Sequence, residues 1–270
     1  MRHPLMATML VLALFASPAF AKEKKDDAKK PEVKEATAKE YKLEKKVFDR
    51  DFDTVDIDFK LEALKRFSKC VHKDVTKELL KLAWKHKDKH VRAQAAKGLM
   101  YQKPYVKQIG PRAAKLLENK KEDPKVLTAL VYSIGVLKYT KAWERIADLI
   151  AHDDDKVVIA CFWTLGEWKD LRAWREIQMF WEMYPTEGKW ATGTVTVDTG
   201  ADTATEQKLA KAKWKAKYGN AQKQRPRPDC VKALKEAVKK MAGTEIKKHE
   251  EWREWCKENK KLIKKAERSG

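Results

Sequence analysis

The side chains that most often carry catalysis or bind metal ions are few in this 270-residue chain, and none stands at a spacing that supports such chemistry. A serine nucleophile is commonly presented by a G-x-S-x-G turn between a strand and a helix, and no serine has that setting. A zinc site needs cysteines or histidines paired a few residues apart, whereas the cysteines are scattered. The cysteines, and the serines beyond residue 21, are Cys70, Cys161, Cys230, Cys256, Ser68, Ser133 and Ser269.

Two histidines, His86 and His90, are four residues apart, but the charged residues between them indicate a turn between helices and not one helix face that would present both rings. No glycine-rich phosphate-binding loop is present. The sequence therefore predicts no catalytic residues, no metal ligands and no cofactor. We expect a protein that is not an enzyme.

The segment 123–181 contains the same sequence pattern twice, and it shows which elements the chain is built from. Shifted by 31 residues, so that Asp123 falls on Asp154, DPKVLTALVYSIGVL matches DDKVVIACFWTLGEW, and KAWERIADLI matches RAWREIQMFW. Apolar residues recur at steps of three and four in each copy, which is helical spacing. Each copy is therefore predicted to form two helices, with Gly135 or Gly166 and the polar residues that follow marking the turn between them.

Self-similarity of this kind is typical of solenoids, in which each helix pair buries its apolar face against its neighbours. Two further copies precede these: one opens with DKHVRAQAAKGLM and has its second helix from Pro111 to Asn119, and a fainter one joins FKLEALKRFS to VTKELLKLAW. The sequence thus predicts an all-α superhelix of about four helix pairs over 59–182. Its predicted core residues are Val91, Leu99, Val126, Leu130, Ile134, Trp143, Ile146, Val157, Cys161, Leu165, Trp174 and Ile177.

The pattern D-x-x-V-R-x-x-A-A-x-x-L, followed by a second helix, resembles a HEAT repeat of the short bacterial kind, and the later copies depart from it by replacing the arginine and the alanines. The resemblance implies an armadillo-like α-solenoid whose second helices line a concave face. The residues that match the pattern are Asp88, Val91, Arg92, Ala95, Ala96 and Leu99. The stretch AGTEIKKHEEWREWCKEN also resembles a C-terminal element of bacterial exported HEAT-repeat proteins, through Trp252, Arg253, Trp255 and Asn259.

The first 21 residues are typical of a secretory signal peptide: Arg2, an apolar run over 5–16, and small residues at Ala19 and Ala21. An apolar run of this length is too short for a membrane span, which needs about 20 residues. We expect cleavage after Ala21, a periplasmic or secreted protein, and no transmembrane segment in what remains.

The rest of the chain divides by composition. Residues 22–58 are rich in both signs of charge and predict a flexible linker. Residues 183–206, rich in Gly and Thr, predict a loop or a short hairpin. Residues 207–270 predict a basic helical C-terminal module, with Asp229 capping one helix, Gly243 ending it, and a last helix from near His249. Cys230 and Cys256 lie on neighbouring predicted helices, and the sequence leaves open whether they form a disulfide.

Charge is strongly positive and unevenly placed. The chain holds 60 Lys and Arg against 40 Asp and Glu, a net charge of +20. Residues 59–110 hold 14 basic and 4 acidic residues, 111–182 hold 12 of each, and 207–270 hold 21 and 8. A concentrated positive field raises the local concentration of anionic partners. Both ends of the folded part are therefore candidate contact surfaces.

Ten tryptophans suggest a different interaction, stacking on bases or sugar rings. Trp143 and Trp174 occupy one repeat position at helical spacing from core residues, so we expect them to pack between repeats. Trp84, Trp190 and Trp214 are not assigned by the pattern.

The functional expectation is an exported, monomeric scaffold that binds another protein through an acidic patch on that partner. One alternative is binding of an anionic polymer, such as nucleic acid, anionic glycan or lipid head groups, through the basic ends. A second is a HEAT-like enzyme, such as a lyase or a glycosylase. The predicted binding residues lie on the second helices of the first two repeats and are Lys77, Lys81, Lys85, Arg112 and Lys115.

Overall fold

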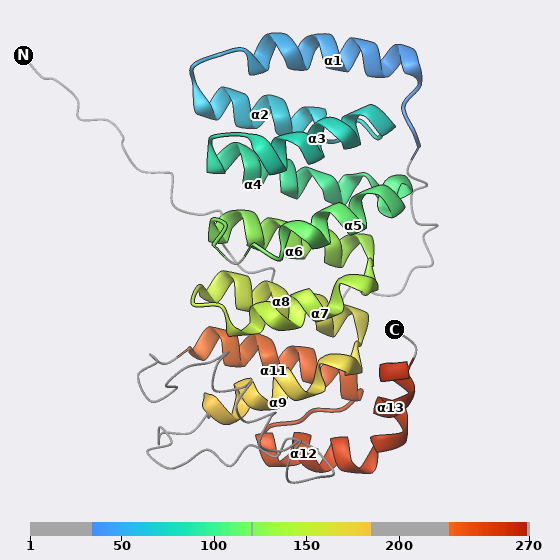
Figure 1. Cartoon of the computed structure of the whole chain (residues 1–270), viewed down its shortest axis with the longest axis vertical. Coiled ribbons are helices and arrows are strands. Elements are labelled where there is room, and N and C mark those ends of the chain that lie inside the picture. Colours follow the sequence, from blue (N-terminus) through green and yellow to red (C-terminus); the bar gives the residue numbers. More distant parts are fainter. Residues whose placement is uncertain (1–33, 120, 185–226, 269–270) are drawn as a thin grey trace, which may run out of the picture. The chain divides into compact units, whose positions relative to one another are not determined.

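The computed structural model describes residues 34–119, 121–184 and 227–268, and every regular element within them is a helix (Figure 1). The chain divides into two units, 1–33 and 34–270. The first unit, which contains the predicted signal peptide, lies outside the described residues, as does the predicted 183–206 loop beyond Tyr184. The second unit has the predicted all-α superhelical fold.

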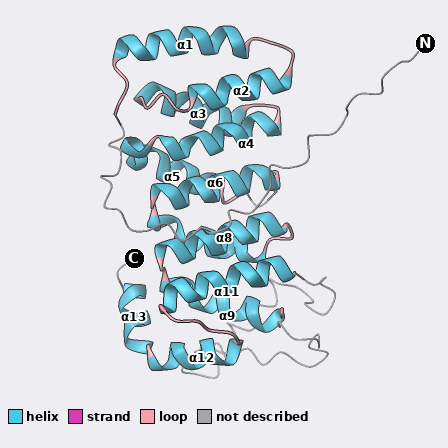
Figure 2. Ribbon diagram, turned by 180° about the vertical axis from the view of Figure 1, so that it is seen from behind, coloured by secondary structure: helices cyan, strands magenta, loops and turns pink. Residues whose placement is uncertain are grey.

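The helices of the second unit form two layers, one of first helices and one of second helices. The layer of second helices faces the viewer in Figure 1, and the layer of first helices faces the viewer in Figure 2. Successive first helices pack on one another, and each second helix, or a 3-10 turn attached to it, contacts the next. The first helices are α2 (Ile57–Phe67), α4 (Lys89–Gly98), α6 (Pro124–Leu137), α8 (Asp155–Trp168) and α11 (Pro228–Ala242). The second helices are α3 (Lys73–Lys85), α5 (Val106–Leu116), α7 (Trp143–Asp148), α9 (Trp174–Met183) and α12 (His249–Glu258).

The C-terminal helices continue the two layers. Helix α11 packs on α8 and α12 packs on α9, so they add a fifth pair to the stack. Gly243, with φ of 73°, ends α11 as predicted, because glycine adopts the left-handed conformation without steric cost. The final helix, α13 (Lys260–Arg268), turns back against the 3-10 turn Leu171–Ala173.

The N-terminal end of the stack is covered by a helix where the sequence predicted a flexible linker. Helix α1 (Ala38–Phe52) begins with a capping box, in which Thr37 and Glu40 each bond the other's backbone N–H. Phe48 is buried and stacks on Phe67 of α2, with ring centroids 4.2 Å apart. The linker prediction was therefore wrong for 38–52, because a few aromatic residues at helical spacing suffice to bury one face of a highly charged helix.

Aspartate caps begin the first helices of all four original repeats. The carboxylates of Asp56, Asp88, Asp123 and Asp154 each accept a hydrogen bond from a backbone N–H of the first turn, which satisfies donors that the helix itself leaves unpaired. Helix α11 differs. It begins at Pro228, so the predicted cap at Asp229 was wrong, and the cap position is occupied by Arg227 without a side-chain cap bond.

The prediction that the repeated glycines mark the turns was also wrong. Gly135 and Gly166 lie inside α6 and α8, and the turns are made by Lys138 and Lys169, which have φ of 55° and 53°. The glycines serve close packing instead. A Cβ on Gly135 would lie 2.7 Å from the Thr164 hydroxyl oxygen, so a larger residue would push α6 and α8 apart.

Helix α5 begins at Val106, five residues before the predicted start at Pro111. Proline lacks the N–H that would bond the carbonyl four residues earlier. Pro111 is in the middle of α5, and both Pro111 and Lys107, whose carbonyl loses its partner, lie on the exposed side of the helix. No helix of the described residues is both long enough and apolar enough to cross a membrane.

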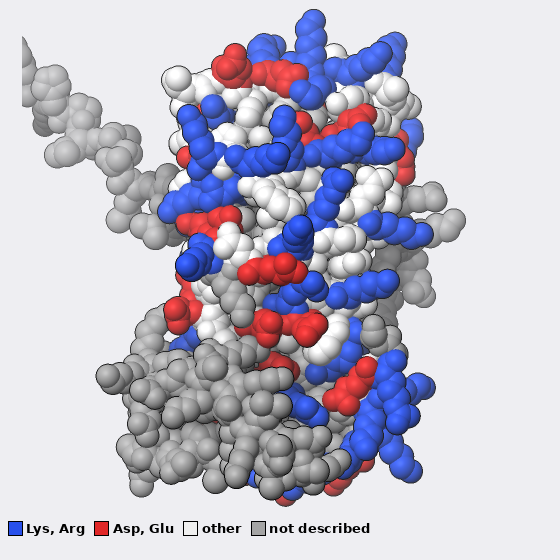
Figure 3. Space-filling view, in the orientation of Figure 1, with Lys and Arg blue, Asp and Glu red and all other residues white. Residues whose placement is uncertain are grey.

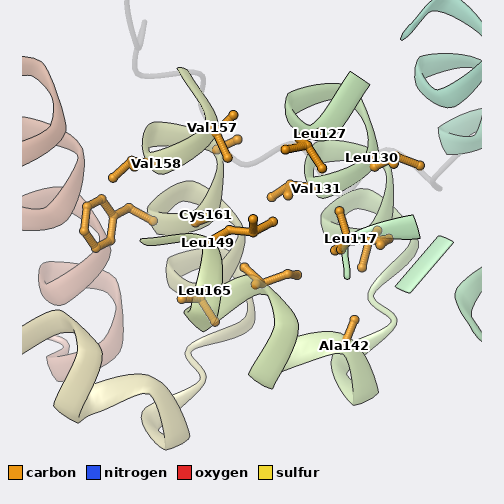
Figure 4. Packing of buried hydrophobic residues seen from close by; sticks show 14 of the residues in the cluster. Leu117, Leu127, Leu130, Val131, Ala142, Leu149, Val157, Val158, Cys161 and Leu165 are labelled. Atoms are coloured by element: carbon orange, nitrogen blue, oxygen red, sulfur yellow. The ribbon is translucent and has the colours of Figure 1, made fainter. Parts of the chain in front are cut away.

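The predicted core residues lie between the two layers, as Figure 4 shows for the central repeats. Ten of the twelve have no exposed surface, and only Trp143 and Trp174 are half-buried. Trp143 is covered by the guanidinium of Arg172 from the next repeat, 5.0 Å from the ring centroid. The two half-buried tryptophans thus lie at the margin of the core.

Hydroxyl groups at one repeat position join the first helices. Ser133 Oγ donates a hydrogen bond to the Ala96 carbonyl at 2.7 Å, and Thr164 Oγ1 donates to the Val131 carbonyl at 3.3 Å. Both hydroxyl residues are buried. Because Ser133 and Thr164 are 31 residues apart, as are Asp123 and Asp154, the same contact recurs at these two junctions, where it fixes the register of one helix on the next.

Candidate binding surface

The histidines and acidic residues of the described chain do not gather as metal ligands: no group of three His, Cys, Asp or Glu side chains is close enough there to hold an ion. His86 is the C-cap of α3, and its Nδ1 accepts a hydrogen bond from the Asp88 backbone N–H at 3.1 Å. The turn predicted around His86 is therefore present, and the imidazole stabilises it.

All four cysteines are free thiols, so Cys230 and Cys256 do not form a disulfide in this structure. Burial raises the pKa of Cys230 and of Cys256 to about 12, and it raises the pKa of Cys161 further. A thiol acts as a nucleophile only after it loses its proton. These three side chains are protonated at neutral pH and serve as small apolar residues in the core.

The predicted binding residues lie on the exposed side of the second-helix layer. Lys77, Lys81 and Lys85 are spaced four residues apart and follow one face of α3. Arg112 and Lys115 are exposed on α5, which is the next helix of the layer. Figure 3 shows Lys and Arg side chains crowded over this part of the stack. We call these five residues the basic row.

Acidic neighbours offset part of the charge of the basic row. Lys77 Nζ lies 2.8 Å from Asp74, and Lys81 Nζ lies 3.8 Å from Glu78. The hydrogen bond from Lys77 lowers the pKa of Asp74. Exposed pairs of this kind are worth little energy, so both lysines can exchange their partner for another anion at small cost.

One exposed residue of α3 that sequence reasoning left unassigned belongs to the same surface. Trp84 is 44% exposed, and it lies seven residues after Lys77 and three after Lys81, which places it on their side of the helix. Tryptophan is enriched among the residues that dominate protein–protein binding energies. The helical spacing of Trp84 from Lys77 and Lys81 is the signal in the sequence that identifies it.

Further along the layer the cations are paired. Arg145 of α7 donates from Nε to Glu118 at 2.8 Å, across from one second helix to the next. Arg172 donates from Nε and Nη2 to the two oxygens of Asp170, at 2.8 and 2.6 Å. Since α7, α9 and α12 each hold more acidic than basic residues, the excess of positive charge on the second-helix layer is confined to α3 and α5.

A second basic surface lies on α13. Ile263 is buried against the stack, and Trp174 Nε1 donates to Glu267 at 3.3 Å, so one side of this helix is fixed. Leu262 is 49% exposed. The exposed cations of α13 are Lys260, Lys261, Lys264, Lys265 and Arg268. The sequence predicts two basic ends, and these residues form the one nearer the C-terminus.

The described residues thus offer two basic surfaces on the helical stack, one on α3 and α5 and one on α13. Comparison with protein-family models gives no match, and no curated protein matches this sequence.

Proposed function

We propose that this chain is an exported, non-enzymatic scaffold of HEAT-like repeats that binds another protein through the basic row. The partner presents an acidic patch to Lys77, Lys81, Lys85, Arg112 and Lys115. Residues from two consecutive second helices contribute, so the stack holds them at a fixed spacing. The protein acts as a monomer and without a cofactor.

The observation that carries this proposal is the exposed indole of Trp84 among the cations of α3. Charged residues steer a partner and determine specificity, but affinity in protein interfaces depends mainly on a few buried aromatic or arginine anchors. Trp84 supplies such an anchor, and Lys81 and Lys85 lie beside it as the polar rim. A surface that only kept the helix soluble would not require the indole.

The proposal is tested by affinity capture from the periplasmic or secreted fraction at low and physiological salt, with wild type and two charge-reversal variants. The first variant changes Lys77, Lys81 and Lys85 to Glu, and the second changes Lys260, Lys261 and Lys264 to Glu. We expect only the first to lose the captured protein, and Trp84→Ala to lose it as well without a change of charge. Loss only in the second variant would move the site to α13.

A second candidate is binding of an anionic polymer by the basic ends, and the five cations of α13 favour it. Each charge that is neutralised releases counterions, so such binding weakens steeply with salt. A protein partner anchored by Trp84 would tolerate salt better, because burial of the indole does not depend on ionic strength. An affinity for the polymer that stays constant between low and physiological salt would exclude this candidate.

A further inference from the structure

The connections between helices carry opposite charge at the two edges of the stack. In the first four pairs, the connections that join a first helix to its second helix are 68–72, 99–105, 138–142 and 169–173, and together they hold six Lys and Arg and one Asp. The four that lead into the next first helix are 53–56, 86–88, 117–123 and 149–154, and they hold eight Asp and Glu and three Lys. We call these the basic edge and the acidic edge.

Direct contacts join the first two connections of the basic edge to each other, and likewise the last two. Gln102 Nε2 donates to the carbonyls of Ser68 and Cys70, at 2.8 and 3.1 Å. Arg172 Nη2 donates to the carbonyl of Thr140 at 3.2 Å. Between these two junctions, the Tyr139 ring lies against Gly110 of α5, so closely that a Cβ there would be 2.3 Å from the ring.

The lysines of this edge are exposed, and among the described residues none forms an ion pair. Its one carboxylate, Asp170, is buried and bonded to Arg172. Two acidic groups beside the edge are also engaged: Glu35 accepts a hydrogen bond from Tyr105 at 2.9 Å, and Asp74 pairs with Lys77. With the lysines that open α3 and α5, the exposed set is Lys69, Lys73, Lys103, Lys107, Lys138, Lys141 and Lys169.

Helix stability does not account for all of these lysines. A cation near the C-terminal end of a helix is favourable, and this suffices for Lys138 and Lys169, which follow α6 and α8. Lys73 and Lys107, however, lie in the first turns of α3 and α5, where the helix dipole favours an acidic residue. Asp74 offsets Lys73 in α3, but the first turn of α5 has no acidic residue, so the cation at Lys107 is unfavourable for the isolated fold and points to an external anion.

We propose that the basic edge binds an extended anionic polysaccharide, which runs along the stack and contacts one connection after another. Packed helices lie about 8–10 Å apart, so the edge presents roughly two lysines for each such step. A chain of sugar rings that each carry one carboxylate has a charge density of that order. Duplex nucleic acid carries one charge per about 1.7 Å, far more than the edge can neutralise.

The chemistry of the edge also favours a polysaccharide. The exposed cations are all lysines, which act as point charges, whereas arginine is the residue that recognises phosphate in a bidentate manner. Single-stranded nucleic acid binds to rows of exposed aromatic rings, and the edge has one, Tyr101. Lys73 of the basic edge lies one turn before Lys77 of the basic row, so the two surfaces adjoin on α3.

The test is binding of polygalacturonate to the full chain by titration calorimetry at low salt. The edge variant changes Lys73, Lys107 and Lys141 to Glu. The matched control changes Lys87, Lys121 and Lys125 to Glu, which alters the net charge equally on the acidic side. We expect the edge variant to lose affinity by about tenfold or more and the control to change by about twofold or less. Thermal unfolding of the edge variant should match or exceed wild type, because acidic residues suit those helix starts.

Three results would overturn the proposal. If the wild-type chain does not bind polygalacturonate, the proposal is wrong. Equal losses in the two variants would show that net charge and not the edge attracts the polymer. Parallel titrations with duplex DNA and with phosphatidylserine vesicles complete the test: tighter binding of either one through the same three lysines would reassign the edge to nucleic acid or to a membrane surface.

Discussion

Gly166 of α8 lies directly against the backbone of Ala237 in α11: a Cβ on Gly166 would be 2.8 Å from the Ala237 Cα. This contact places the fifth first helix in the same register as the others, since Gly135 meets Thr164 in the corresponding way. The two glycines differ in what opposes them. Gly135 faces side chains that can shift, whereas Gly166 faces a main chain that cannot.

We therefore expect Gly166→Ala to destabilise the protein more than Gly135→Ala does. Overpacking costs about 1–3 kcal/mol, and the better helix propensity of alanine returns up to about 1 kcal/mol. The net loss should be about 1–2 kcal/mol for Gly166→Ala and smaller for Gly135→Ala, measured by urea unfolding. Equal losses, or a larger loss at Gly135, would show that α11 is not held at this distance from α8.

Leu130 lies in the centre of the core with no exposed surface. Leu130→Ala should cost about 2–5 kcal/mol, because the truncation leaves a cavity that the neighbouring helices fill only in part. Leu43→Ala on the exposed side of α1 is the control, and it should change stability by less than about 0.5 kcal/mol. A Leu130→Ala variant that unfolds at the wild-type temperature would mean that the repeat register is assigned incorrectly.

Arg227 is 6% exposed and joins the start of α11 to the preceding pair. Its Nε donates to Asp155 at 2.7 Å, and Nη1 donates to the His152 carbonyl at 2.9 Å. Arg227→Met should cost about 3 kcal/mol, because the half-buried Asp155 carboxylate then loses this cation and the carbonyls of His152 and Asp153 lose a donor. Hydrogen exchange should show the loss first in α11.

The control for Arg227 is Arg145→Met, which removes an exposed ion pair with Glu118. Exposed pairs contribute about 0–1 kcal/mol, so this variant should unfold close to wild type. If both variants were equally stable, the guanidinium of Arg227 would not be what attaches the fifth pair.

The buried thiols predict loss of stability in alkali. Cys161, Cys230 and Cys256 have raised pKa values, the latter two about 12, so the folded chain keeps protons that the unfolded chain releases above about pH 9. The free energy of unfolding should fall with rising pH from about 9 towards 12, by up to about 1.4 kcal/mol per pH unit for each thiol. Urea unfolding under reducing conditions at pH 8, 9 and 10 measures this slope.

Cys256→Ala should reduce that slope by about the contribution of one thiol, since one fewer proton is released on unfolding. An unchanged slope would show that Cys256 ionises in the folded protein. Below pH 8 the thiols should make no difference, because both states keep their protons.

The central repeats could be predicted from sequence because their signals are local. The aspartates that begin each first helix and the apolar steps of three and four lie within one repeat, and ten predicted core residues have no exposed surface. Helix α1 was missed because its inward aromatics, such as Phe48, are diluted by charged residues that merely face water. Charge composition measures the exposed side of a helix and says little about the buried side.

The fifth pair could not be recognised because its evidence is not local. Helix α11 has Arg227 where the other first helices have an aspartate, and its register depends on Ala237 meeting Gly166. Residues 185–226 separate the fifth pair from the fourth in the sequence, so a fixed period cannot find it. The exposed surfaces were predicted only in part, since the sequence indicated Lys77 and its neighbours but not which connections share an edge.

Because one contact between helices recurs, a further repeat can be added to the stack. Residues 123–153 end where an equivalent segment begins, and Ser133 and Thr164 both bond the helix before them. A tandem duplication of 123–153 should therefore be accepted as an additional repeat, with the inserted first helix meeting partners that it already fits. Because neighbouring repeats stabilise each other, the longer chain should melt at a higher temperature than the natural one. It would also carry a second copy of Lys138 and Lys141, so the length of the basic edge can be varied independently of its chemistry.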